Sequence, residues 1–151
     1  MNIFEWNENI PVTAGNLNEM QNTINNNITE STTPTVLWTN PNPNNNFSAS
    51  QITLSSGDYD FLEIYYYEWS GDSYSWRDLK CAKVMKGYHT VLEAIISRDG
   101  KGYVGARRVR YTNATTLQVD TCYTLILENA FSATAADAFC VPVKIYGYKY
   151  S

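Results

Sequence analysis

Four carboxylates lie close together in the sequence, at positions Asp58, Asp60, Glu63 and Glu68. Two carboxyl groups roughly 5–9.5 Å apart form the catalytic pair of most glycosidases, so a glycan-degrading module is one alternative. Asp58 and Asp60 flank an expected turn, however, and Glu63 and Glu68 are expected to face solvent. Asp58 and Asp60 also lack the further oxygen ligands of a calcium loop. The cluster therefore favours a solvated surface over a catalytic or metal site.

The histidine and the cysteines give weak signals for catalysis or metal binding. His89 is the only histidine, and no Gly-x-Ser-x-Gly elbow or comparable motif offers it a nucleophile. Cys81, Cys122 and Cys140 are odd in number and far apart, without the CxxC spacing of a zinc site. They favour free thiols in a protein assembled in a cytoplasm over a disulfide framework. We expect no metal and no other cofactor.

Three arginines near two tyrosines raise the question of nucleic-acid binding, because stacking and guanidinium contacts hold single strands. Strand alternation divides them: Arg107 shares a face with Val109, whereas Arg108 and Arg110 point to the other face. The chain also has a net charge of -4 and an isoelectric point near 4.9, which opposes the basic footprint that polynucleotides require. We expect ordinary strand surface or an inter-subunit salt bridge here, and no nucleic-acid partner.

The segment 63–69 is the clearest candidate for recognition. It reads Glu-Ile-Tyr-Tyr-Tyr-Glu-Trp, and alternate residues of a strand face opposite sides. Leu62, Ile64 and Tyr66 make the better core face, which leaves three aromatic rings and a carboxylate on the other face. Exposed rings stack on the apolar faces of sugars or fill a subunit interface. With one further residue beyond a short Gly-Asp turn, the predicted ligand-binding residues are Tyr65, Tyr67, Trp69 and Trp76.

An apolar stripe near the N-terminus predicts a short helix that associates with copies of itself. Thr13 can cap this helix, and apolar residues then recur at spacings of three, four and four. The remaining residues are polar, and so narrow a stripe suits a coiled-coil seam better than a globular core. The alternative is a helix folded back on its own domain. The predicted oligomerisation residues are Leu17, Met20, Ile24 and Ile28.

Beyond Pro34 the pattern changes to short runs rich in β-branched and aromatic residues, separated by turn residues. Expected strands cover residues 36–39, 48–54, 61–69, 79–86, 91–97, 103–111, 116–127 and 139–148. Asp99 and Gly100 indicate a hairpin between the fifth and sixth of these. We expect an antiparallel β-sandwich of jelly-roll type. The chain then divides into an N-terminal attachment segment, residues 1–34, and a β-sandwich domain, residues 35–151.

Parts of the sequence resemble virion proteins of bacteriophages and prophages. Val12-Thr-Ala-Gly-Asn-Leu-Asn-Glu-Met20 resembles the attachment segment of tail-fibre, receptor-binding and head-fibre proteins, in which a phrase such as Ile-Thr-Ala-Glu-Asn-Leu-Asn-x-Met starts a short helix. Gly15 replaces the usual Glu of that phrase, which removes a favourable helix-dipole interaction of about 0.3–1 kcal/mol. The phrases at 37–43, 51–55 and 59–65 and the closing strand at 140–149 are similar to structural proteins of phages, commonly those of gut Firmicutes.

The resemblance implies a structural virion protein that is assembled in the bacterial cytoplasm and joins other virion proteins through its N-terminal segment. Together with the apolar stripe it implies a homotrimer. We expect a tail-fibre or receptor-binding protein that contacts a polysaccharide of the host surface and has no enzymatic activity. The alternative is a capsid-bound head fibre, a decoration protein or an adaptor that binds no receptor. The sequence contains neither a secretion signal nor a stretch of membrane-span length, so we expect no membrane partner.

Overall fold

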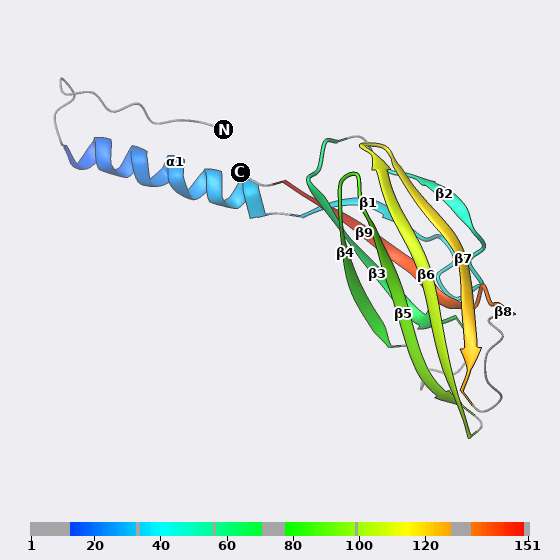
Figure 1. Ribbon diagram of the computed structural model, residues 1–151. Coiled ribbons are helices and arrows are strands. Elements are labelled where there is room, and N and C mark those ends of the chain that lie inside the picture. Colours follow the sequence, from blue (N-terminus) through cyan, green and yellow to red (C-terminus); the bar gives the residue numbers. More distant parts are fainter. Residues whose placement is uncertain are drawn as a thin grey trace.

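One helix and two antiparallel sheets make up the computed structural model, which describes residues 13–32, 34–55, 57–70, 78–98, 100–127 and 134–149. The sheets pack face to face as a β-sandwich, and the helix extends from one end of it (Figure 1). The predicted fold class, a mainly β chain with a short N-terminal helix, is confirmed. Among the described residues, no helix is long and apolar enough to cross a membrane.

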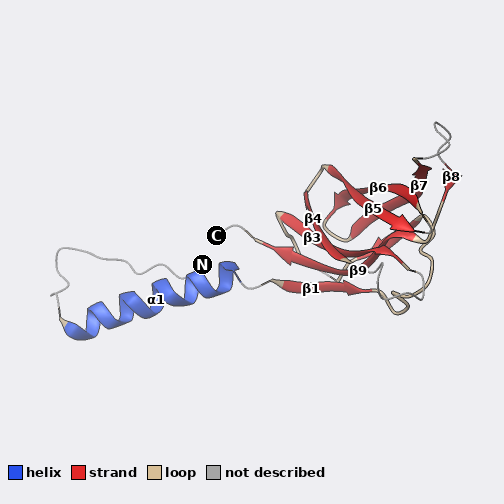
Figure 2. Cartoon of the chain, turned by 90° about the horizontal axis from the view of Figure 1, so that it is seen from below, coloured by secondary structure: helices blue, strands red, loops and turns tan. Residues whose placement is uncertain are grey.

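Helix α1 (Ala14–Thr32) begins directly after Thr13, whose carbonyl accepts a hydrogen bond from the Leu17 N–H at 3.1 Å. Its first turn contains no acidic residue, as the Gly15 substitution led us to expect. Figure 2 shows the helix pointing away from both sheets, and no strand in the described part of the chain packs extensively against it. The helix is therefore not folded back on the β domain.

Sheet A has the strand order β1-β9-β3-β4, and sheet B has the order β2-β7-β6-β5 with the short β8 beside β7. All eight predicted strands are present, and among the strands that the structure describes only β8 was missed, because two residues show no periodicity. The strands are β1 (Thr35–Thr39), β2 (Ser50–Thr53), β3 (Phe61–Trp69), β4 (Leu79–Met85), β5 (His89–Arg98), β6 (Lys101–Asn113), β7 (Thr116–Ile126), β8 (Thr134–Ala135) and β9 (Phe139–Tyr148).

The connections combine long-range pairs with simple hairpins. Strand β1 pairs with β9 and β2 pairs with β7, so early strands meet late strands in both sheets, as in a jelly roll. The pairs β3·β4, β5·β6 and β6·β7 join neighbours in sequence instead. The predicted hairpin between β5 and β6 is confirmed, and Gly100 in its turn has a φ of 75°, which favours glycine.

The core lies between the sheets and follows the predicted alternation in β3. Leu62, Ile64 and Tyr66 are buried there, as predicted. The Tyr66 hydroxyl donates a hydrogen bond to the Glu93 carbonyl at 3.0 Å and accepts one from the Glu93 N–H at 3.2 Å. Because β5 is an edge strand of sheet B, these bonds satisfy backbone groups that would otherwise form an unpaired edge.

The prediction that Glu68 faces solvent is wrong. Glu68 lies on the core face of β3 and is buried. Its carboxylate accepts a hydrogen bond from the Ile95 N–H at 3.1 Å and forms an ion pair with Lys80. A buried carboxylate is stable only when such partners replace water, and here they come from the neighbouring edge strands β4 and β5.

Candidate functional site

The outer face of sheet A, away from the core, carries the predicted aromatic residues of β3. Tyr65 and Tyr67 are half-buried there, beside Glu63 on the same strand. Trp69, at the end of β3, is half-buried and packs against the core. Trp76 lies outside the described residues. The structure therefore places two of the four predicted ligand-binding residues together on one open sheet surface.

Strand β9 adds aromatic residues that the sequence prediction missed. Its pairing with β3 places Tyr148 opposite Phe61 and Tyr146 opposite Glu63. The Phe61 and Tyr148 rings stack with centroids 4.7 Å apart, and the Tyr65 and Tyr146 rings meet edge to face at 5.5 Å. We call this surface the aromatic platform, and its rings belong to Phe61, Tyr65, Tyr67, Tyr146 and Tyr148.

Charged groups are interleaved with the rings of the aromatic platform. The Tyr148 hydroxyl donates a hydrogen bond of 2.7 Å to Glu63 Oε2, and the Tyr65 hydroxyl lies 3.5 Å from the same oxygen. Lys83 Nζ, from β4, lies 3.4 Å from the Phe61 ring centroid, and Lys144 Nζ, from β9, lies 5.2 Å from that of Tyr146. These cation–π contacts and the hydrogen bond hold the rings in fixed orientations.

The phenol groups of Tyr65 and Tyr148 remain neutral at physiological pH, because the pKa of each is raised. Burial, followed by the hydrogen bond and charge of Glu63, raises the pKa of Tyr148. The negative charges that Cys81 and Glu63 carry when ionised raise the pKa of Tyr65. Burial and the Glu63 charge also raise the pKa of Cys81 itself. The platform thus presents hydroxyl donors and acceptors beside apolar ring faces.

Three of the four carboxylates that cluster in the sequence have separate partners in the structure. Asp58 forms an exposed ion pair with Lys86, Glu63 accepts from Tyr148, and Glu68 is buried in the core. Glu63 is the only one of these three that lies on the aromatic platform. The described residues of the platform offer rings, hydroxyls and single charges, which suit binding, and they include no facing pair of carboxylates of the kind that glycosidases use.

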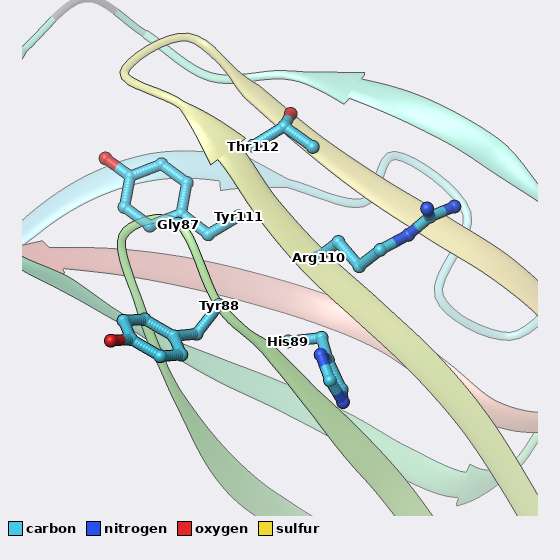
Figure 3. Close-up of a pocket in the computed structure, with 6 residues that line it drawn as sticks. All are labelled: Gly87, Tyr88, His89, Arg110, Tyr111 and Thr112. Atoms are coloured by element: carbon cyan, nitrogen blue, oxygen red, sulfur yellow. The ribbon is translucent and has the colours of Figure 1, made fainter.

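His89 lines a small hollow at one end of sheet B, of about 240 Å³. Figure 3 shows the hollow between β5 and β6, with the rings of Tyr88 and Tyr111 on one side of His89 and Arg110 extending away from them toward β7. Glycine and threonine complete the lining, so no carboxylate or thiol of the described residues lines the hollow beside His89. The hollow thus lacks the orienting acid that a histidine-dependent triad needs.

The three arginines of β6 divide between the two faces of the strand as predicted, but Arg107 does not lie on ordinary strand surface. Its side chain is fully buried, and its guanidinium donates to the Phe47 carbonyl and approaches the Asp137 carbonyl at 3.4 Å. Arg108 and Arg110 are exposed and both pair with Asp120 of β7, at 2.7 and 2.9 Å. These two salt bridges form within one chain, and a bridge between subunits stays a prediction.

The described residues contain no group of three or more potential metal ligands. Cys122 and Cys140 are buried and Cys81 is exposed, and all three are free thiols. Comparison of the chain with protein-family models, with curated proteins and with solved structures finds no match. The functional interpretation therefore depends on the residues and on their geometry.

Proposed function

We propose that this chain is a structural protein of a bacteriophage virion, of the tail-fibre or receptor-binding type. In this proposal α1 holds three copies together, and the aromatic platform binds a glycan of the host surface. The observation that carries the proposal is the aromatic platform, an open sheet surface on which four tyrosines keep part of their rings accessible.

Sugar rings have an apolar face of C–H groups and a rim of hydroxyls. Tyrosine rings bind the first by stacking, and their hydroxyls bind the second by hydrogen bonds. Glu63 and Lys144 add an acceptor and a donor between the rings. An open sheet surface of this kind fits an extended polysaccharide better than a small molecule, because small molecules are usually enclosed in concave pockets.

The helix supports the assembly part of the proposal. Leu17 and Ile24 are 45% and 43% exposed, and Met20 is half-buried. The side chain of Ile28 is not among those that the structure describes. A helix of this length, rich in asparagine, is marginal in water on its own. Burial of the stripe against two further copies of α1 would stabilise it, as in a trimeric coiled coil.

The test of glycan binding is attachment of the labelled full chain to a panel of Firmicutes cells. Tyr67→Ala is expected to weaken attachment at least fivefold while the thermal unfolding midpoint stays within a few degrees. Tyr88→Ala is the matched control, because Tyr88 is 70% exposed and lies in the turn between β4 and β5, outside the platform. Equal attachment by the Tyr67 and Tyr88 variants would refute the platform as a glycan site.

The test of assembly is the solution mass of the full chain and of a version that lacks residues 1–34. A trimer that becomes monomeric on truncation supports α1 as the assembly element. A monomeric full chain would contradict the trimer. Immunogold labelling of virions then separates two roles, since label at the tail tip supports receptor binding and label over the capsid supports a head fibre.

A further inference from the structure

We propose that the outer face of sheet B holds a second binding site, specific for a carboxylated saccharide such as a uronic acid. The site is a hollow of about 320 Å³ between β6 and β7, lined in part by Arg108, Arg110, Asp120, Thr121 and Tyr123. It lies on the opposite side of the sandwich from the aromatic platform, so this proposal does not depend on the proposed function of that platform.

The charge of the hollow favours an anion. Arg108 Nε and Arg110 Nη2 each donate to one oxygen of Asp120, so two guanidiniums share a single carboxylate. The local charge is therefore +1. A guanidinium has five N–H donors, and within the described part of the chain no other group accepts from either arginine. The remaining donors can bind a ligand carboxylate in the forked geometry that arginine prefers.

A bulge in β7 arranges these groups. Arg107 pairs with Cys122 and Val109 pairs with Val119, so two residues of β7, Asp120 and Thr121, lie opposite Arg108 alone. Both of them line the hollow. Bulges of this kind redirect side chains and are frequent beside binding sites. Asp120 thus fixes the orientation of both guanidiniums before a ligand arrives, and the Thr121 hydroxyl is available to a sugar hydroxyl.

Tyr123 gives the hollow its preference for a sugar over a simple anion. Its side chain is 54% exposed and stands at the edge of the hollow, two residues beyond Thr121. An exposed ring next to a guanidinium pair can stack on the C–H face of a sugar while the arginines bind its carboxylate. Polynucleotides fit less well, because they need several cations along a groove and the chain has a net charge of -4.

The test is titration of the full chain, at constant ionic strength, with a panel of uronic acid disaccharides and with the neutral disaccharides of the same linkages. The acidic sugars are expected to bind at least tenfold more tightly than their neutral counterparts. Arg108→Gln and Arg110→Gln should each weaken binding about tenfold, the loss expected for a charged hydrogen bond. Tyr123→Ala should also weaken it, by several-fold.

Lys86→Gln is the matched control, because Lys86 is an exposed cation with an acidic partner elsewhere on the surface. This variant should bind the acidic sugars as the unchanged chain does, and so should Tyr67→Ala, whose residue belongs to the aromatic platform. Both arginines are exposed, so their variants should keep the unfolding midpoint of the unchanged chain.

Three results would overturn the proposal. The first is that no uronic acid disaccharide of the panel binds, or that neutral sugars bind equally well. The second is that acetate binds as tightly as the sugars, which would reduce the hollow to a simple anion site. The third is that an oligothymidine binds more tightly than any sugar and loses affinity in the arginine variants, which would assign the site to nucleic acid.

Discussion

Replacing Arg107 with alanine is expected to destabilise the sandwich far more than the same change at Arg108, its neighbour on β6. Arg107 is fully buried, and its guanidinium joins the β1–β2 loop, through the Phe47 carbonyl, to the turn before β9, through Asp137. Arg108 is 54% exposed and has a single carboxylate partner. The two variants therefore remove the same side chain from opposite faces of one strand.

The expected loss can be worked out from the contacts. A hydrogen bond to a charged group contributes about 1.5–3 kcal/mol, and breaking a buried ion pair costs about 3–5 kcal/mol. The Asp137 carboxylate is 3.7 Å from the guanidinium and one-third exposed, so water partly replaces its lost partner. We therefore expect a loss of about 3 kcal/mol for Arg107→Ala, toward the lower end of that range. For Arg108→Ala we expect less than about 1 kcal/mol.

Equilibrium unfolding in urea, followed by tryptophan fluorescence, measures both free energies of unfolding. An unchanged m-value shows that each variant exposes the same amount of surface on unfolding as the unchanged chain. Arg107→Met separates packing from hydrogen bonding, because it keeps the apolar stem of the side chain but removes the guanidinium donor of the Phe47 carbonyl. The Asp137 carbonyl keeps its hydrogen bond from the Phe47 N–H at 2.9 Å. Arg107→Met should still cost at least about 2 kcal/mol. If Arg107→Ala costs no more than Arg108→Ala, the buried guanidinium does not hold these segments together and the reasoning is refuted.

Three further predictions concern acid stability, packing and thiol reactivity. Partial burial opposes ionisation of Asp120, but its two arginine partners outweigh this effect and hold the pKa of its carboxyl below the ordinary value of 3.8. The ionised Asp120 carboxylate therefore stabilises the fold above about pH 4, and this contribution is lost as the pH falls through the lowered pKa. On going from neutral to acid pH, the urea midpoint of Asp120→Asn should therefore fall less than that of the unchanged chain. Gly147→Ala should cost about 1–3 kcal/mol, because its new Cβ would lie 2.6 Å from the Tyr59 ring and 2.7 Å from a methyl group of a core leucine. The new Cβ of Gly102→Ala would approach closely only a terminal methyl group of the exposed Leu127, at 2.8 Å, and this flexible side chain can move, so the variant should change urea stability by less than about 0.5 kcal/mol; equal effects of the two glycine variants would contradict the packing. Ellman's reagent should react with one thiol of the native chain, the exposed Cys81, and with all three after unfolding, since Cys122 and Cys140 are buried; reaction of a second thiol at a rate similar to that of Cys81 would show that the core opens.

The sequence by itself predicted the local features of this protein. Alternation identified the strand 61–69 and its core face at Leu62, Ile64 and Tyr66, and Asp99 with Gly100 predicted the β5–β6 hairpin. These predictions succeeded because each depends on residues that are neighbours in the chain. The same is true of α1, whose helical periodicity is visible in the sequence.

The aromatic platform, in contrast, depends on a pairing that local patterns do not specify. Lys144, Tyr146 and Tyr148 alternate in the sequence and could be assigned to one face of a strand. Only the pairing of β9 with β3 places that face beside Tyr65 and Glu63. The choice of partner strand reflects the packing of the whole core, summed over many contacts between residues far apart in the chain.

Burial of charge was likewise decided by the tertiary structure. Alternation placed Arg107 on the opposite face from Arg108, but it did not show that the Arg107 face is the interior. Glu68 was expected to face solvent, but it lies on the core face of β3 and is buried. A charged side chain is buried only where specific partners compensate for lost water, and those partners, the Phe47 carbonyl for Arg107 and the Ile95 N–H for Glu68, come from distant segments that the fold brings together.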